Sequence, residues 1–332
     1  MSTQNVTMPN PADGKSNAAW RFVGRRLLSS AIALFLMLTF VFFAVDLLPG
    51  DAAEMILGRD ATAQAVEALR HDLGLNLPLY QRYATWIVNL AHGDLGVSLA
   101  NHRSVADLVL GRFGNTIFLA ALAAALAVPL SLFLGILAAL YRNTLFDRLS
   151  SITTLSVVSF PDFFVAYTLI LFLSIRFSIF PSIADISSST PFWDRLYASL
   201  LPALTLVLFV MAHMMRMTRA AIVDVLSRPY VEMARIKGMS PLYIILRHAL
   251  PNAWAPIINV VIFNLAYLIT GVVIVEVVFA YPGLGQLLVD SVTKRDITVV
   301  QACSLIFAVT YVGLNLLADI LSILANPRLR QQ

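Results

Sequence analysis

An aspartate inside an apolar segment is the residue of this chain best suited to chemistry. Asp162 follows Pro161 within residues 152–175, where an unpaired carboxylate costs about 3 kcal/mol and has to face protein or water. Pro161 frees a backbone carbonyl and is expected to bend its helix. Asp162 lies either on the path of a solute, where it can meet an amino group, or in a structural pair. We favour the path, because ionisable residues inside membranes are functional by default. For Asp319, near the inner end of the last apolar segment, we favour a structural pair.

The remaining polar residues indicate neither a metal centre nor a nucleotide site. Three histidines share one loop without the spacing of metal ligands, and another stands among methionines, which are common core residues. These residues are His71, His92 and His102, then His213 with Met211, Met214, Met215 and Met217. The sequence has no G-x-x-x-x-G-K-[ST] loop that would cradle a triphosphate. We expect no catalytic residue, no metal and no cofactor bound by this chain.

The composition requires a membrane environment for these residues. Of the 332 residues, 59% are hydrophobic and 13% are charged, whereas soluble domains are about 45–50% apolar. We therefore expect an integral membrane protein in contact with lipid, and the formal charge of +4 indicates no nucleic-acid partner. The single cysteine, Cys303, cannot form an intramolecular disulfide.

Six segments are apolar and long enough to cross the hydrocarbon core, which needs about 20 helical residues. They are Leu27–Val45, Asn115–Leu140, Ile152–Ile175, Leu200–Met217, Ile257–Phe279 and Val299–Leu324. The first follows Arg25 and Arg26 as a secretory signal would, but its apolar stretch is longer than that of a signal and no small-x-small cleavage site follows. We expect an all-α membrane protein with six spanning helices, the first retained as an anchor.

The distribution of basic residues predicts the orientation. Basic residues gather before Leu27 and in the segment 216–247, so both regions belong in the cytoplasm by the positive-inside rule. They include Lys15, Arg21, Arg25 and Arg26 in the first region, and five arginines with Lys237 in the second. An even number of spans places the carboxyl end, with Arg328 and Arg330, inside as well.

This topology divides the chain into five parts. They are a cytoplasmic tail (1–26), the first spanning helix (27–48), an extracytoplasmic loop domain (49–113), a five-helix core with a polar loop at 229–252 (114–325), and a second cytoplasmic tail (326–332).

The polar loop in the core predicts a hairpin of two short helices. Pro229 suits a first helical turn, Glu232 and Lys237 complement the two ends of the first helix, and Gly238 supplies a left-handed stop. Ser240 can cap the second helix, which we expect to begin at Pro241 and to be closed by Pro251. A cytoplasmic hairpin of this kind is shaped to be held by a soluble partner.

The same loop resembles a known family motif. Glu232, Ala234, Gly238 and the sequence His248-Ala-Leu-Pro251 are similar to the EAA loop, E-A-A-x3-G-x9-I-x-L-P, of the permease subunits of ATP-binding-cassette (ABC) importers. Met233 and His248 depart from the motif, although Arg247-His248-Ala-Leu is similar to the dipeptide, oligopeptide and nickel permease branch. Four further stretches agree with that branch, at residues 48–51, 77–98, 276–288 and 315–330.

The resemblance implies a type I ABC importer permease of a bacterial inner membrane. Its implied partners are a second permease subunit, forming a heterodimer, two cytoplasmic ATPases that bind ATP and Mg, and an extracytoplasmic solute-binding protein. In that family the hairpin docks into the ATPase, which assigns coupling roles to Glu232, Ala234, Lys237, Gly238, Arg247, His248, Leu250 and Pro251.

The outer segments receive two further assignments. Residues 79–90 form an amphipathic pattern with aromatic residues before a turn, and the resemblance places this region where the binding protein docks. The docking candidates are Tyr80, Tyr83, Trp86 and Asp94. The candidates for the translocation path or outer gate are Pro161 and Asp162 with Glu276, Pro282, Gly283 and Gly285.

Peptides or similar small solutes are the expected cargo. Two alternatives remain open at this point: the same kind of importer serving sugars, oligosaccharides or nickel, and a secondary transporter without ATPases. The second alternative leaves the hairpin unexplained and lacks visible inverted repeats.

Overall fold

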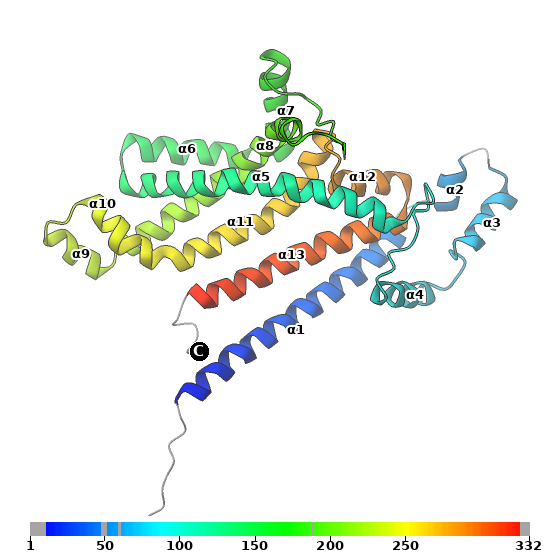
Figure 1. The fold of residues 1–332 in the computed structure, drawn as a ribbon, viewed down its shortest axis with the longest axis horizontal. Helices are drawn as coiled ribbons and strands as arrows, with labels where there is room; N and C mark the ends of the chain where they lie inside the picture. Colours follow the sequence, from blue (N-terminus) through cyan, green and yellow to red (C-terminus); the bar gives the residue numbers. More distant parts are fainter. Residues whose placement is uncertain (1–10, 48–51, 59–60, 188, 326–332) are drawn as a thin grey trace, which may run out of the picture.

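The computed structural model describes residues 11–47, 52–58, 61–187 and 189–325. The long elements of this part are all helices (Figure 1), and extended backbone pairs in one isolated bridge between Val97 and Ser104. Among the described residues, five helices are long and apolar enough to cross a membrane, and a bent pair makes a sixth span when its two halves are taken together. This confirms the predicted all-α membrane fold. The predicted tail 326–332 and the stretch 48–51 lie outside the described residues.

The unbroken spanning helices are longer than the apolar segments that predict them. They are α1 (Pro11–Asp46), α5 (Val105–Leu140), α8 (Phe192–Leu226), α11 (Leu250–Val278) and α13 (Ile297–Ala325). Apolarity marks only the part of a helix inside the hydrocarbon core, whereas backbone hydrogen bonding continues into polar flanks. The helix α1 therefore begins well before Leu27, and α5 begins inside the predicted outer loop.

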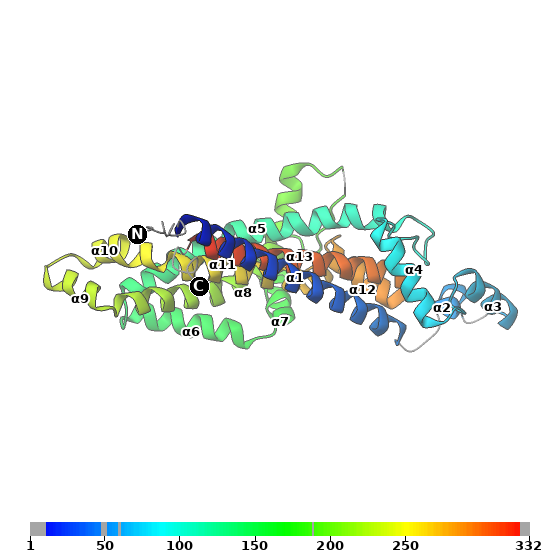
Figure 2. The same ribbon diagram turned by 90° about the horizontal axis from the view of Figure 1, so that it is seen from below.

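Short helices occupy the two ends of the molecule. One end carries α2 (Ala52–Leu57), α3 (Ala63–Asp72) and α4 (Leu79–Ala91), and the other carries α9 (Pro229–Ile236) and α10 (Pro241–Ile244) (Figures 1 and 2). The helix α12 (Leu284–Lys294) lies between the end of α11 and the start of α13. The hairpin and the outer helices therefore lie at opposite ends of the bundle of spanning helices.

The third predicted span is broken rather than bent. Residues 152–175 fall in α6 (Leu145–Ser159), α7 (Asp162–Leu169) and the π-helical segment η1 (Ile170–Arg176), and the two halves meet at 104°. Phe160 is extended (φ −92°, ψ 142°), because a residue before proline is disfavoured in helical conformation. Asp162 therefore lies in the first turn of α7 and not in the middle of a continuous helix.

Small residues allow the central helices to approach closely. Ala123, Ala127 and Ala138 of α5 are fully buried, and a Cβ added at Gly135 would lie 2.9 Å from the carbonyl oxygen of Met215 in α8. Such close approach is typical of helix packing in membranes. Near the hairpin end, Arg219 of α8 donates two hydrogen bonds of 2.6 and 2.7 Å to the buried carboxylate of Asp147, which holds α6 against α8.

The outer loop is attached to the last spanning helix through one buried carboxylate. Asp296 precedes α13 and accepts hydrogen bonds from the Ser98 hydroxyl and from the backbone N–H groups of Leu99 (3.1 Å) and Ala100 (3.4 Å). Each of these donors lies almost 200 positions earlier in the chain. The bonds fix the segment that leads into α5 against the start of α13.

Candidate coupling and gate sites

The hairpin turns through a Schellman motif, as its glycine predicts. Gly238 has a φ of +79°, its N–H donates to the Arg235 carbonyl (2.9 Å), and the Met239 N–H donates to the Ala234 carbonyl (3.3 Å). This pair of bonds closes a helix end when the residue after the cap is left-handed. Met239 packs against the cluster of Val231, Ala234 and Ile244, which joins α9 to α10.

The second half of the hairpin begins as predicted but does not end at Pro251. The Ser240 hydroxyl accepts a 3.4 Å hydrogen bond from the Tyr243 N–H, so Ser240 caps α10. The helix then continues through the π-helical turn η2 (Ile245–Ala249) into α11 without a break. Pro251 stands in the first turn of α11, directly after the π-helical turn, so the residue without an N–H coincides with the interruption of regular hydrogen bonding. The prediction that Pro251 closes the helix is therefore wrong.

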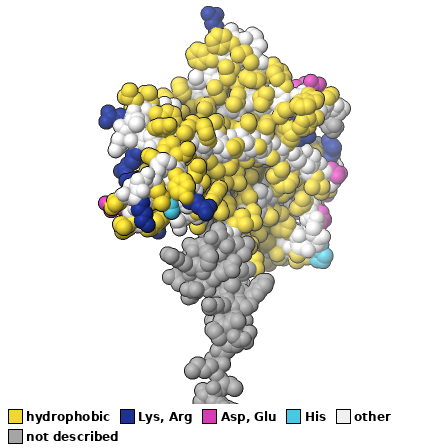
Figure 3. Space-filling model, turned by 60° about the vertical axis from the view of Figure 1, so that its left-hand side comes forward, with side chains coloured by type: hydrophobic (Ala, Val, Ile, Leu, Met, Phe, Trp, Pro, Cys, Tyr) yellow, Lys and Arg dark blue, Asp and Glu magenta, His cyan; other side chains and the backbone are white. Residues whose placement is uncertain are grey.

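The hairpin presents apolar side chains to its surroundings. Five large hydrophobic residues on α9, α10 and η2 are 50–73% exposed: Met233, Ile236, Leu242, Tyr243 and Leu246. Figure 3, with the hairpin end turned forward, shows hydrophobic side chains over most of the visible face and Lys and Arg side chains mainly near its edge. A protruding apolar surface of this kind, outside the spanning helices, is typical of a protein contact.

The predicted coupling residues divide into exposed and supporting groups. Glu232, Lys237 and Arg247 are exposed around the hairpin, whereas Ala234 is buried in the cluster that holds its two helices together. The ring of His248 lies 6.0 Å from that of Tyr243, and its buried Nε2 atom has no hydrogen-bond partner among the described residues. Leu250 and Pro251 begin α11, and Leu250 packs between α8 and α11.

Four of the six residues predicted for the path or gate, all except Pro161 and Asp162, meet at the end of α11 that lies away from the hairpin. Glu276 is fully buried, and its carboxylate accepts hydrogen bonds from the Thr116 hydroxyl (2.6 Å) and from the N–H groups of Gly285 (2.6 Å) and Gln286 (3.2 Å). The Thr116 hydroxyl also accepts from the Leu284 N–H (2.8 Å). This carboxylate therefore joins α11, α5 and the first turn of α12 in one outer-turn lock, defined by Glu276, Thr116, Gly283 and Gly285.

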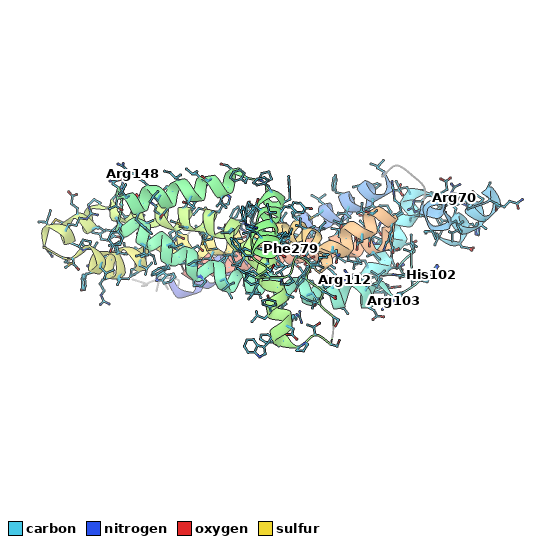
Figure 4. All side chains as sticks on the ribbon, turned by 90° about the horizontal axis from the view of Figure 1, so that it is seen from above. Arg70, His102, Arg103, Arg112, Arg148 and Phe279 are labelled. Atoms are coloured by element: carbon cyan, nitrogen blue, oxygen red, sulfur yellow. The ribbon has the colours of Figure 1, made fainter. Side chains whose placement is uncertain are left out.

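Asn115 strengthens the same turn from the side of α5. Its amide donates to the Pro282 carbonyl (2.8 Å) and accepts from Arg195 (3.1 Å), while the Tyr281 hydroxyl donates to the Asn115 carbonyl (3.0 Å). In Figure 4, Phe279 lies near the middle of the long axis, with Arg112, Arg103 and His102 on the outer side and Arg148 toward the hairpin. The gate candidates thus form an internal, closed connection.

The lock leaves no room for side chains at its glycines. A Cβ added at Gly283 would overlap the Glu276 carboxylate, and one added at Gly285 would lie 2.7 Å from the Val273 Cα atom. The φ angles of Gly283 and Gly285 are not positive. Close approach, and not backbone conformation, therefore requires glycine at both positions.

The four docking candidates have different surroundings. Tyr83 and Trp86 pack against Phe42 of α1, with ring centroids 5.1 and 5.5 Å apart, and so hold α4 against α1. Tyr80 is 70% exposed. Asp94 is exposed and accepts from the Gly96 N–H (2.8 Å) within a turn. The structure does not bring the four side chains together.

The remaining intramembrane acids have partners of different kinds. Asp319 forms a 3.0 Å ion pair with Arg26 of α1, as its expected structural role requires. Asp162 instead begins α7, which packs against α8 and α11, the helices that carry His213 and Tyr267. From the sequence, we considered His213 only as a metal ligand and did not single out Tyr267. The available signal was a polar ring in the middle of each apolar span.

A cleft of about 470 Å³ opens between four spanning helices on the side of the hairpin. It is lined by Arg26, Met217, Asn259, Val260, Phe263, Asn315, Ala318 and Asp319. None of the residues predicted for the path or gate lines this cleft. Its wall combines apolar side chains, two amides and the Arg26–Asp319 ion pair.

Comparison with known proteins agrees with this arrangement. Residues 131–331 match the family described as the inner membrane component of binding-protein-dependent transport systems, and residues 19–120 match its N-terminal family. The glutathione transport system permease protein GsiC of Escherichia coli strain K12 is 40% identical over 93% of this chain and 98% of its own length. The proteins of that name from Shigella dysenteriae serotype 1 and Escherichia coli O6:H1 have the same identity and coverage.

Proposed function

Because this chain belongs to the family of inner membrane components of binding-protein-dependent transport systems, we propose that it is the permease subunit through which an ABC importer carries short peptides. Family membership makes the chain a multi-pass inner membrane permease and argues against the alternative hypothesis of a secondary transporter without ATPases. The peptide cargo is supported by the glutathione transport named for relatives that are 40% identical over nearly the whole chain.

The observation that carries the coupling role is the capped hairpin with its exposed apolar side chains. We assign ATP and Mg binding to two cytoplasmic ATPases that grip this hairpin through the surface around Glu232, Lys237 and Arg247. The five exposed hydrophobic residues supply contact area, and Ala234, Gly238, Leu250 and Pro251 hold that surface in shape. His248 stands beside it against Tyr243.

The outer elements would serve the other partners. A second, different permease subunit completes the pathway, of which this chain forms half, and a solute-binding protein docks on the outer end near Tyr80 and Asp94. Tyr83 and Trp86 support that surface by holding α4 on α1. Glu276, Pro282, Gly283 and Gly285 keep the outer turn closed, and Pro161 and Asp162 border the path at the break in the third span.

Reconstitution tests this function directly. The tagged chain is purified from its native membrane with its co-purifying subunits, placed in liposomes, and supplied with the binding protein and labelled glutathione. We expect ATP-dependent uptake that needs the binding protein and ATPase subunits that co-purify with the chain. Uptake by liposomes that contain this chain alone would contradict the proposal.

The proposed orientation predicts a labelling pattern. In a Cys303→Ser background, Ser189→Cys in the loop before α8 should react in sealed cells with a membrane-impermeant maleimide, because this position is exposed on the outer side. Arg142→Cys, exposed between α5 and α6 at the hairpin end, should react only after permeabilisation. The reverse pattern would place the hairpin and both termini outside the cytoplasm and would exclude coupling to cytoplasmic ATPases.

A further inference from the structure

Three polar side chains from three different elements meet inside the spanning part of the molecule. They are Asp162 in the first turn of α7, His213 on α8 and Tyr267 on α11. The rings of His213 and Tyr267 have centroids 6.2 Å apart, and Asp162 begins α7, which packs against both α8 and α11. We call these three residues the polar cluster.

The polar cluster lies on a face that this chain does not cover. Tyr267 is 42% exposed, and Asp162 and His213 are partly exposed. Tyr267 belongs to an exposed stripe along α11 with Phe263, Thr270, Ile274 and Val277, spaced three and four residues apart. Because a carboxylate facing lipid is costly, this face is expected to meet water or another protein.

The cleft and the polar cluster form one continuous surface. Met217 and Phe263 line the cleft, and His213 and Tyr267 stand four residues before and after them on the same two helices. Residues four apart lie one above the other on a helix, so on both α8 and α11 the cluster is the next turn beyond the cleft. Two independent helices therefore place the cluster one turn beyond the end of the cleft.

We propose, on the basis of the peptide-import function above, that the polar cluster binds the protonated amino group of the passing peptide in the wall of the pathway. An ammonium group has three donors, and the cluster offers the Asp162 carboxylate, an imidazole nitrogen and a phenol oxygen as acceptors. The face of the Tyr267 ring adds attraction for a cation. The substrate class is thus a zwitterionic peptide with a free amino terminus.

The charge next to the cluster suits the other end of such a solute. Arg216 is exposed on α8, three residues beyond His213, and its charge acts on His213. Its guanidinium can donate hydrogen bonds to a carboxylate of the peptide while the ammonium group of the peptide lies at Asp162. The cluster and its neighbour on α8 therefore offer one negative and one positive charge, as a zwitterion requires.

Transport by the reconstituted complex tests the role of the charge. Asp162→Asn should lower glutathione uptake about tenfold, the loss expected when a charged hydrogen-bond partner is removed. Asp162→Glu should retain most of the uptake, because the charge is kept. Asp185→Asn is the matched control, since Asp185 is exposed in the outer loop before α8. Uptake by Asp162→Asn within twofold of the unaltered complex, at equal recovery, would overturn the proposal, as would equal losses in the Asn and Glu variants.

A second measurement does not depend on transport. His213→Cys in a Cys303→Ser background should react with a small, water-soluble thiol reagent, and S-methylglutathione, which has no thiol to consume the reagent, should slow the reaction several-fold when the binding protein and ATP are present. A cysteine that stays unreactive would show that the cluster does not line an aqueous path and would overturn the inference. If the unaltered complex imported no peptide, the proposed function would fail, and the peptide assignment with it. Labelling without protection would likewise contradict peptide binding at the cluster.

Discussion

Gly238→Val should leave the permease in the membrane but lower the ATP hydrolysis stimulated by the loaded binding protein at least tenfold. The left-handed conformation at Gly238 (φ +79°) is costly for a β-branched residue, by about 1–3 kcal/mol. A strain of this size is comparable with the coupling energies that link distant sites. Relief of the strain would open the Schellman turn and move α9 relative to α10, so the hairpin would no longer fit its ATPase.

The control separates conformation from contact. A Cβ at Gly238 meets no atom of this chain within 4 Å, so the added carbon does not clash within the hairpin. Asparagine tolerates the left-handed region, and Gly238→Asn should therefore retain most of the stimulated hydrolysis. Both variants are purified and scored for co-purified ATPase and for stimulated turnover. Equal activity of the valine variant and the unaltered complex would make Gly238 an ordinary loop residue and remove the mechanical basis of the coupling role.

Gly283→Ala should destabilise the permease by about 3 kcal/mol or more, because the new methyl group displaces the buried Glu276 carboxylate from its partners. The Gly285 and Leu284 N–H groups and the Thr116 hydroxyl depend on this arrangement. We expect a lower melting temperature of the detergent-purified protein and loss of transport. Gly313→Ala in α13 is the control, since a Cβ there meets nothing within 4 Å and alanine favours a helix.

A double substitution tests the cause of this effect. Glu276→Ala removes the carboxylate that the alanine at position 283 would strike, so adding Gly283→Ala to Glu276→Ala should cost little further stability. Strong coupling between the two substitutions is the expected result for residues in direct contact. If the two losses of stability added independently, the overlap at Gly283 would not be the reason for its glycine.

The local features of the hairpin could be predicted from the sequence alone. Pro229, Gly238 and Ser240 act through rules that depend on a few neighbouring residues, and the structure places all three as those rules require. The end of the second helix could not be predicted in the same way. Pro251 is compatible both with a chain that leaves a helix and with the first turn of the next one, and only the π-helical turn before it shows which applies.

Features that depend on packing between distant segments were harder to predict from the sequence. Pro161 predicted a bend, but the angle of 104° is set by the helices against which α7 packs. Tyr83 and Trp86 were predicted to contact the binding protein, and their packing on Phe42 of α1 depends on a segment about 40 residues away. The polar cluster draws its members from three segments, so no local pattern connects Asp162 with His213 and Tyr267.

The helix that leaves the hairpin also carries the outer-turn lock. From Pro241 to Val278 the chain is one helical rod of 38 residues, roughly 55 Å long at 1.5 Å per residue. This rod packs against α8. If it tilts as a rigid body about that contact, a sideways movement of α10 moves Glu276 in the opposite direction. Hydrogen bonds of 2.6 Å do not survive a shift of even one ångström. A displaced hairpin and an intact outer turn are therefore incompatible unless the rod flexes near its inner end, where η2 and Pro256 interrupt its regular hydrogen bonding.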